Sequence, residues 1–278
     1  MSVLKNHDTP ESGEIRLLLE NVFHDHGVDF REYAPASLRR RIWNAVRAEG
    51  LTTVSGLQEK VLRDPAGLGR LLLALTVNVT SLFRDPGFFL AFREKVAPLL
   101  RIHPFIRLWC AGCATGEEVY SIAILLEEEG LYDRCRIYAT DMNEAVLRKA
   151  REGIFPLSVM QEYTSNYLRA GGKRPFSGYY TAAYDHAIFR PSLKQHIVFA
   201  QHNLVTDTSF NEFNIILCRN VMIYFNQLLQ KRVHQLLYGS LIKFGILGVG
   251  EKESLRFTPH EGDYAELDSR AKIYRKVR

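Results

Sequence analysis

From about residue 105 onward, the chain alternates short apolar runs with segments of helical periodicity, and this alternation limits its fold more than any other feature. The helix expected after the first run has apolar residues at steps of three and four and stops near Gly130. Strands that alternate with helices pair into a mainly parallel sheet covered by helices, so we predict a doubly wound α/β domain. The expected strands are FIRLWC, CRIYATD, HIVFA, FNIILCRN, ILGVG and the closing SRAKIYRKVR.

The first eighty residues follow a different pattern. Apolar residues recur there at steps of three and four, broken by Gly or Pro, in GEIRLLLENVFHDHG, PASLRRRIWNAVRAEG and AGLGRLLLALTVNVT. We therefore predict an all-helical N-terminal domain over residues 1–79 and the α/β domain over 101–278. Within that domain the pattern breaks at about 153–195, where an alternating stretch predicts a small antiparallel β insertion.

Composition and charge exclude several classes of protein. No apolar run approaches the ~18 residues of a membrane span, and the polar start lacks a signal-peptide core, so we expect a cytoplasmic protein. Four cysteines in 278 residues do not make a disulfide framework. The formal charge of +5 favours an acidic partner without saying which kind.

The stretch WCAGCATGEEVYS follows the first expected strand and holds a C-x-x-C pair, Cys110 and Cys113. A zinc site needs about four ligands, but Cys135 and Cys218 are isolated in the sequence. A redox thiolate prefers electropositive surroundings, whereas two glutamates follow within a turn. We therefore expect no metal and interpret both cysteines as small packing residues.

The same stretch suits a bound cofactor at the carboxyl edge of a parallel sheet. Gly112, Ala114 and Gly116 let the backbone approach a ligand closely, while the acids that open the next helix disfavour a pyrophosphate. Asp141 ends the second expected strand, where an acid can accept both hydroxyls of a ribose. Small residues beneath the ligand, an acid that can bind the ribose and the lack of a phosphate-binding loop together indicate S-adenosylmethionine. Alone, Asp141 would more simply be the N-cap of the following helix.

Five motifs fall in the order and spacing of one family: TSLFRD (80–85), CAGCATGEEVYSIA (110–123), ATDMNEAVLRKAREGIFP (140–156), CRNVMIYF (218–225) and GVGEKESL (248–255). The chain resembles the CheR family of chemotaxis receptor glutamate O-methyltransferases. The resemblance implies an N-terminal four-helix-like domain, a linker over residues 80–100 and a Rossmann-like S-adenosylmethionine-dependent methyltransferase domain with a β-subdomain. The chain departs from the family in the turn that usually reads GHSE, where Glu251 stands at the usual His.

The resemblance also implies residue roles. Arg84 would fix the substrate carboxylate, and Tyr224 would lie close to the transferred methyl. In some relatives the β-subdomain binds a peptide from the receptor C-terminus, and the sequence does not show whether it does so here. The cofactor contacts implied by motif are Asn78, Thr80, Arg84, Gly112, Glu118, Asp141, Asn203, Leu204, Arg219 and Asn220.

The run Arg39 to Arg41, with Arg47 further along, is either a solvated basic face or a docking surface for an acidic receptor bundle. Because the family uses a basic N-terminal helix for docking, we expect Arg39, Arg40 and Arg47 to contact methyl-accepting chemotaxis receptors. The protein would then be a monomer that meets the membrane only through the receptor, with S-adenosylhomocysteine as product.

Two other functions compete with this hypothesis. A methyltransferase acting on nucleic acid is encouraged by the pI near 9.0. However, CRNVMIYF stands where base methylases place a proline-containing motif, and basic tracts interleaved with aromatic residues are missing apart from KRPFSGYY. A regulatory module that binds the cofactor without turnover is the other alternative, although the matched motifs look intact.

Overall fold

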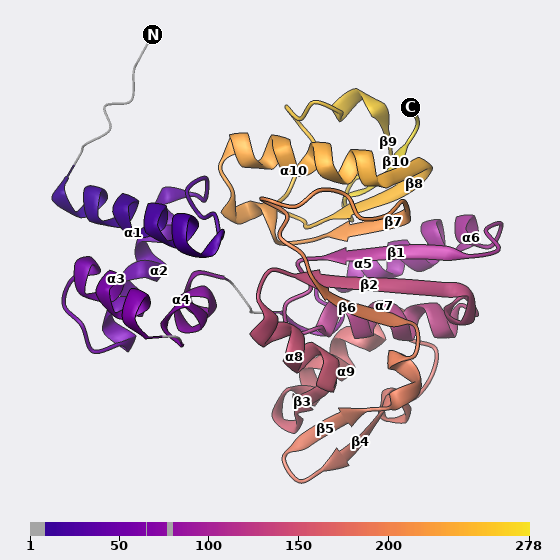
Figure 1. Cartoon of the computed structure of the whole chain (residues 1–278). Coiled ribbons are helices and arrows are strands. Elements are labelled where there is room, and N and C mark those ends of the chain that lie inside the picture. The colour runs from indigo at the N-terminus through magenta and orange to yellow at the C-terminus, as the bar shows by residue number, and fades with distance from the viewer. Residues whose placement is uncertain (1–8, 65, 77–79) are drawn as a thin grey trace. The chain divides into compact units, whose positions relative to one another are not determined.

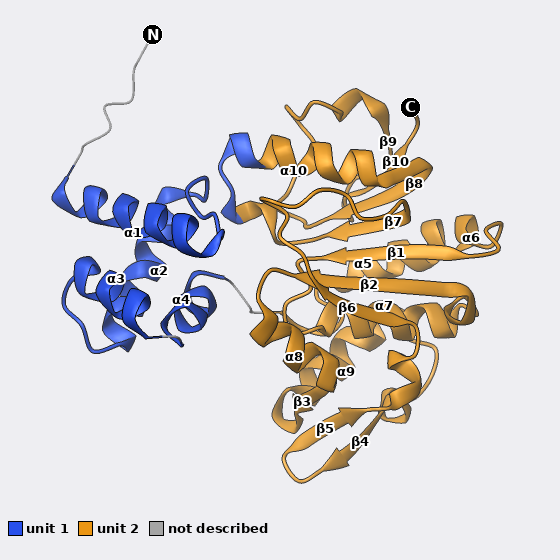
Figure 2. Cartoon of the chain, in the orientation of Figure 1, with its two compact units in different colours: residues 1–77, 224–229 blue, residues 78–223, 230–278 orange. Residues whose placement is uncertain are grey.

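The structure is a computed structural model, and it describes residues 9–64, 66–76 and 80–278. The chain divides into two compact units: one comprises Met1–Val77 with Tyr224–Leu229, and the other comprises Asn78–Ile223 with Gln230–Arg278 (Figure 2). Each unit is described below by itself. In the described part of the chain, the helices are too short or too polar to cross a membrane.

The first unit is built from helices (Figure 1). Its α3 lies outside the three segments whose periodicity predicts helices, although Val54, Leu57 and Val61 form a buried apolar stripe and Thr53 Oγ1 accepts the N–H of Gly56 at 3.1 Å. The stripe spans only about two helical turns, and so short an apolar pattern does not by itself predict a helix. The helices are α1 (Pro10–His26), α2 (Pro35–Ala48), α3 (Val54–Arg63) and α4 (Gly67–Leu75).

A short segment from late in the chain also belongs to this unit. The backbone N–H of Ala34 donates to the carbonyl of Tyr224 at 2.8 Å, and the N–H of Asn226 donates to the carbonyl of Glu32 at 2.9 Å. The rings of Tyr33 and Phe225 meet edge to face, with centroids 5.0 Å apart. Backbone pairing and ring packing therefore tie residues 224–226 to the segment that leads into α2.

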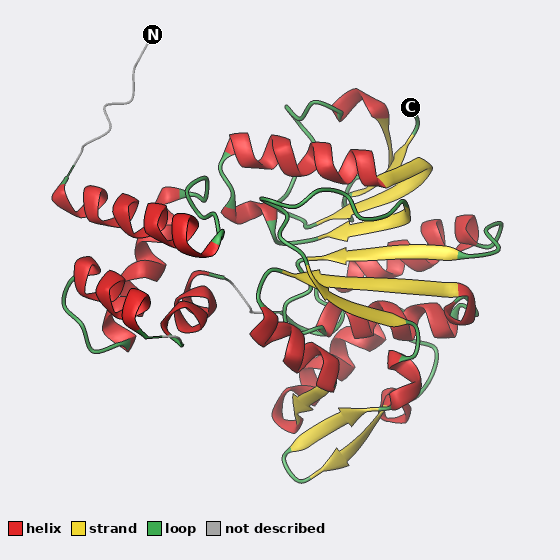
Figure 3. Ribbon diagram, viewed as in Figure 1, coloured by secondary structure: helices red, strands yellow, loops and turns green. Residues whose placement is uncertain are grey.

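In the second unit, the seven strands of the main sheet that the structure describes run in the order β6-β2-β1-β7-β8-β10-β9. The pairs from β6 to β8 are parallel, and β10 is antiparallel to both neighbours (Figure 3). From β1 the chain moves outward through α7 to β2, and later returns to build β7, α10 and β8 on the other side. Since such crossovers are right-handed, α7 and α10 lie on opposite faces of the sheet. The predicted doubly wound α/β fold is thus confirmed.

The elements of the main sheet and its helices have the following bounds. The strands are β1 (Ile106–Ala111), β2 (Cys135–Asp141), β6 (Ile197–Gln201), β7 (Phe213–Cys218), β8 (Leu241–Val249), β9 (Tyr264–Asp268) and β10 (Ile273–Lys276). The helices are α5 (Pro86–Ala91), a π-helical turn (Phe92–Val96), α6 (Ala97–Leu100), α7 (Glu117–Glu128), α8 (Glu144–Glu152), α9 (Met160–Arg169) and α10 (Gln227–Ser240), whose first residues fall in the first unit.

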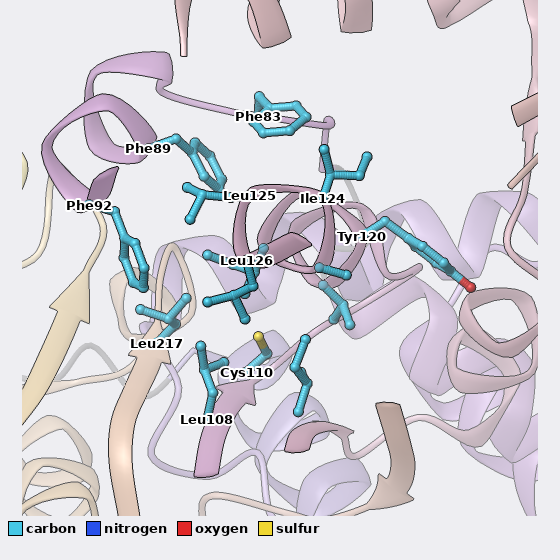
Figure 4. Close-up of a cluster of buried hydrophobic side chains, with 14 of the residues drawn as sticks. Phe83, Phe89, Phe92, Leu108, Cys110, Tyr120, Ile124, Leu125, Leu126 and Leu217 are labelled. Atoms are coloured by element: carbon cyan, nitrogen blue, oxygen red, sulfur yellow. The ribbon is translucent and has the colours of Figure 1, made fainter. Parts of the chain in front are cut away.

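The stretch 80–100, expected as a linker, contributes to the core of the second unit. Phe83, Phe89 and Phe92 are buried and pack with Leu125 of α7 (Figure 4). This stretch packs into the core and is not a linker because it carries three aromatic side chains. Burying these rings stabilises the fold far more than leaving them exposed to water in a linker would.

The small antiparallel sheet expected within 153–195 is present, in the order β3-β5-β4. The helix α9, which the broken sequence pattern concealed, precedes its hairpin. Glu128 at the end of α7 holds this region: it accepts the hydroxyl of Tyr179 at 2.8 Å and pairs with Arg93, and both partners of that ion pair are buried. The strands are β3 (Ile154–Pro156), β4 (Tyr180–Ala183) and β5 (His186–Phe189).

Candidate functional site

The predicted cofactor residues of the second unit follow the carboxyl ends of neighbouring strands. β6, β2, β1 and β7 are adjacent and parallel, so the segments that leave them meet at one edge of the sheet. The chain reverses its direction of sheet growth at β1, and ligands of open α/β sheets bind at such a switch point. Asp141 is the last residue of β2, and Gly112, Asn203 and Arg219 come shortly after the ends of β1, β6 and β7.

The turn after β1 is fixed against the end of β2. The N–H groups of Gly112 and Cys113 both donate to the carbonyl of Thr140, at 2.8 and 2.9 Å. Gly112 has φ +76°, and an added Cβ would lie 2.6 Å from Cγ2 of Val221. Glycine is therefore required here for two reasons, the left-handed backbone and the close approach of a neighbouring loop.

Asp141 is held by the backbone on both sides. Its Oδ2 accepts the N–H of Ala114 and its Oδ1 accepts the N–H of Asn143, each at 3.0 Å. Burial raises the pKa of Asp141, and the backbone N–H groups oppose that effect. The N-cap of α8 is Asn143, whose Oδ1 accepts the N–H of Ala145 at 2.9 Å, so Asp141 is not the helix cap. Each carboxylate oxygen keeps lone-pair capacity for a further donor such as a ribose hydroxyl.

Arg219 brings three of the expected residues together. Its Nη1 donates to Oε2 of Glu118 at 2.7 Å, and its Nη2 contacts Oδ2 of Asp85 at 3.0 Å and the carbonyl of Arg84 at 3.3 Å. The guanidinium lies 3.9 Å from the centroid of the Phe88 ring, and the side chain is only 2% exposed. Burial raises the pKa of Glu118, although the cation of Arg219 acts in the opposite direction.

Glu253 organises the loop after β7, and the sequence analysis missed it. Its Oε1 accepts the N–H groups of Val221 and Met222 at 2.9 and 2.7 Å. Its Oε2 accepts those of Asn220 and Gly250 at 2.9 and 2.5 Å. Asn220 has φ +60°, so a buried carboxylate stabilises a left-handed turn beside the turn after β1. Glu253 lies in the GVGEKES turn two residues after Glu251, which is exposed.

The other expected residues of the second unit have weaker indications of a role. The Oδ1 of Asn203 accepts a hydrogen bond from the N–H of Val205 at 3.0 Å, within the same turn. Leu204 and Thr80 are half-buried, and Asn78 lies outside the described residues. The side chain of Asn203 is therefore already engaged within its own turn.

The remaining expected residues belong to the first unit. Tyr224 is half-buried there and lies against the guanidinium of Arg41. Arg39 forms a two-bond contact with Glu11, at 2.8 and 2.7 Å, whereas Arg40 and Arg47 are exposed on α2. The basic run is therefore not one surface, since its third arginine, Arg41, is buried.

The C-x-x-C pair is buried in the second unit as free thiols. Burial raises the pKa of both Cys110 and Cys113 well above the ordinary value, which disfavours a reactive thiolate. Within residues 9–64, 66–76 and 80–278, His, Cys, Asp and Glu form no group of three or more that could hold a metal ion.

The chemistry of this edge fits a cationic cofactor that carries a ribose. Asp141 offers buried carboxylate oxygens at a strand end, and Glu118 adds a second, half-buried acid. The first turn of α7 carries Glu117 and Glu118, where a dinucleotide would need its pyrophosphate. The residues present thus suit S-adenosylmethionine better than a phosphate-rich cofactor.

Comparison with known proteins gives matches over both units. The family model described as the CheR methyltransferase SAM binding domain matches residues 78–272, and that of the CheR methyltransferase all-alpha domain matches residues 13–76. The Cher3 protein of Pseudomonas putida is 49% identical over 263 residues, covering 95% of this chain and 96% of that protein.

Relatives with chemotaxis names are more distant. The chemotaxis protein methyltransferase 2 of Pseudomonas aeruginosa is 30% identical over 250 residues, covering 87% of this chain and 86% of the relative. The chemotaxis protein methyltransferase of Salmonella typhimurium is 29% identical, covering 86% of this chain and 83% of the relative. The family resemblance and the cofactor expected from the sequence are both confirmed: the chain belongs to the CheR methyltransferase family and is an S-adenosylmethionine-dependent methyltransferase.

Proposed function

We propose that this protein is a protein-glutamate O-methyltransferase that esterifies glutamate side chains on the cytoplasmic helical bundle of chemoreceptors. The observation that carries the proposal is the match to both CheR domains in their order along one chain. The chemotaxis names of several relatives support the same substrate class.

The reaction makes modest demands on the protein. A glutamate carboxylate with a pKa of about 4.3 is ionised at neutral pH, so no general base is needed. S-adenosylmethionine supplies an electrophilic methyl on a sulfonium. With the cofactor bound, one carboxylate oxygen would bond to that methyl as the carbon–sulfur bond breaks, and the sulfur would keep the electron pair. The protein contributes mainly alignment of oxygen, methyl and sulfur.

The residues of the second unit divide this task between them. We assign Asp141 to the ribose hydroxyls, because its carboxylate is fixed by two backbone donors and has acceptor capacity left. Glu118 would face the cationic part of the cofactor, with Arg219 fixing its orientation. Gly112 and Asn220 would supply the close backbone approach. The contacts carried over from the family are Asn78, Thr80, Asn203 and Leu204.

We assign the substrate carboxylate to Arg84 and Tyr224. An arginine that paired with the carboxylate too tightly would stabilise the ground state, so orientation is the role proposed for Arg84. The Tyr224 hydroxyl would donate a hydrogen bond to the carboxylate and direct its second oxygen to the methyl.

The test is methyl transfer from tritiated cofactor to receptor-rich membranes of the host, with the modified residues mapped by mass spectrometry. The expected result is alkali-labile label on glutamate residues of the receptors. Base-stable label in an RNA sample run in parallel would replace the proposal with the nucleic-acid alternative. Calorimetric binding of S-adenosylhomocysteine without transfer to any of the host's receptors would favour the regulatory module.

A further inference from the structure

The third arginine of the basic run points to a role that docking does not explain. Arg39 and Arg40 are exposed, but Arg41 is only 6% exposed. A charged side chain is costly to bury unless its partners compensate the lost hydration. Burial lowers the pKa of Arg41, in keeping with that cost.

The contacts of Arg41 hold its guanidinium in one place. Its Nη1 donates to the carbonyl of Leu75, at the end of α4. The guanidinium carbon lies 4.4 Å from the centroid of the Tyr224 ring. Its Nη2 is buried and has no hydrogen-bond partner among the described residues. The guanidinium of Arg41 thus forms only part of the hydrogen bonds that it could donate, and it lies against the Tyr224 ring.

The backbone on both sides of this contact is fixed. The carbonyl of Tyr224 accepts the N–H of Ala34 at 2.8 Å, one residue before α2 begins. The next residue, Phe225, forms an isolated antiparallel bridge with Tyr33. With the backbone clamped, the remaining freedom of Tyr224 lies in its side-chain torsions, and a cation over the ring face restricts these.

We propose that Arg41 is a positioning residue for Tyr224: it sets the direction of the phenol hydroxyl toward the substrate carboxylate. This inference rests on the proposed function, in which Tyr224 orients the incoming glutamate. The helix α2 would then serve the reaction on two faces. Its outer face, with Arg40 and Arg47, would contact the receptor, while its inner face would hold the tyrosine.

A double-mutant cycle tests the inference in the full chain. The variants are Arg41→Met, Tyr224→Phe and the combination, assayed with receptor and S-adenosylmethionine at saturation. The matched control is Arg63→Met on α3, whose side chain is 80% exposed. For each variant kcat, KM for receptor, Kd for S-adenosylhomocysteine and Tm are measured.

We expect Arg41→Met to lower kcat about tenfold with KM for receptor changed by less than about twofold. In the Tyr224→Phe background the same substitution should change kcat by less than about twofold, because Arg41 acts through the hydroxyl that is gone. A tenfold loss in both backgrounds, or no loss in either, would overturn the inference. If Arg41→Met lowers Tm strongly, Arg41→Gln replaces it, since its amide can still donate to the carbonyl of Leu75.

The cycle also separates this inference from the proposed function. If Tyr224→Phe leaves kcat at the wild-type value, the role assigned to Tyr224 is wrong and the inference ends with it. If Tyr224→Phe lowers kcat but Arg41→Met does not, Tyr224 keeps its role and only the positioning role of Arg41 is overturned.

Discussion

Buried carboxylates shape the cofactor edge in two different ways. Glu253 accepts backbone N–H groups of two loops, and it compensates its burial with four short hydrogen bonds. Glu117, by contrast, accepts the hydroxyl of Thr115 at 2.6 Å and that of Tyr163 at the longer distance of 3.5 Å. Glu253 therefore stabilises the loops around it. Burying the ionised Glu117 instead costs free energy, and that cost depends on pH.

Replacing Glu253 with glutamine should weaken cofactor binding. The amide group would turn one N–H toward backbone donors, and each buried donor left without an acceptor costs about 1–3 kcal/mol. We expect the Kd for S-adenosylhomocysteine to rise by about tenfold or more, measured by calorimetry. The neighbouring Glu251→Gln, at an exposed position of the same turn, is the matched control. Equal affinities for the two variants would contradict the role given to Glu253.

Glu117 predicts a pH-dependent difference in stability. Burial raises the pKa of Glu117, so the folded state holds its proton at a pH where the unfolded chain has released it. The free energy of unfolding therefore falls as the pH rises from about 4.3, the ordinary glutamate value, through the folded pKa. Glu117→Gln removes this dependence.

Urea unfolding at several values between about pH 4.5 and pH 7.5 measures the effect. The stability of wild type relative to Glu117→Gln should decrease as the pH rises and level off above the folded pKa of Glu117. The same substitution at the exposed Glu152 serves as control. Parallel pH profiles for wild type and Glu117→Gln would mean that the burial of this carboxyl has no energetic consequence.

At the residue scale, the sequence predicts the place of a residue that lies at the end of a strand or within a motif. Asp141 was predicted from its place at a strand end and Arg219 from its place in a family motif, and in the structure the first ends β2 and the second follows β7. Glu253 was missed because its partners are main-chain N–H groups, which carry no mark in the sequence. Arg41 was grouped with exposed arginines because helical periodicity alone does not show which turn another segment covers.

At the scale of elements, strand ends determine where the site forms. The turn after β1 depends on Gly112, which combines a left-handed φ with a close contact to Val221. Gly130, at the end of α7, has φ +68° but no atom within 4 Å of an added Cβ. The two glycines therefore differ in steric contact while sharing backbone strain.

Gly112→Ala should destabilise the protein more than Gly130→Ala. Both variants lose about 1–2 kcal/mol to the left-handed backbone, and overpacking against Val221 adds about 1–3 kcal/mol to the first alone. Urea unfolding measures the difference, and calorimetry should show weaker binding of S-adenosylhomocysteine only for Gly112→Ala. Equal losses in the two variants would show that the turn and the loop after β7 move apart at little cost.

The sequence predicted most elements of the α/β domain because their apolar patterns are regular. CRIYATD corresponds to β2 residue for residue, and the helix expected to stop near Gly130 ends at Glu128. The helix α9 was missed because its apolar residues are mostly aromatic and lie among Gly- and Pro-rich pieces. Its Tyr163 and Tyr167 pack against a core that only the tertiary fold creates.

At the scale of the whole molecule, the helical unit is built from two segments that lie far apart in the sequence. Tyr224–Leu229 belongs to the helical unit, although residues on both sides belong to the other. The hydrogen bonds from Ala34 and Asn226 that fix this return depend on backbone pairing between segments far apart in the chain, which hydrophobic periodicity does not report. The segment that carries Tyr224 is therefore part of the domain proposed to dock the receptor.

The docking proposal predicts a loss of receptor recognition when the exposed charges of α2 are reversed. The variant Arg40→Glu with Arg47→Glu should raise KM for receptor by about tenfold or more, because like charges would repel an acidic bundle. The Kd for S-adenosylhomocysteine should stay within about twofold of wild type, since both side chains point to solvent from the first unit.

Salt and a matched charge reversal decide whether the effect belongs to α2 itself. Raising the ionic strength should increase KM for wild type and change it little for the double variant, since exposed charges are screened over about 8–10 Å. Arg63→Glu on α3 also reverses an exposed charge of the helical unit and should leave KM near wild type. An equal rise in KM for this control would assign the effect to net charge, and an unchanged KM in the double variant would leave α2 as an ordinary solvated face.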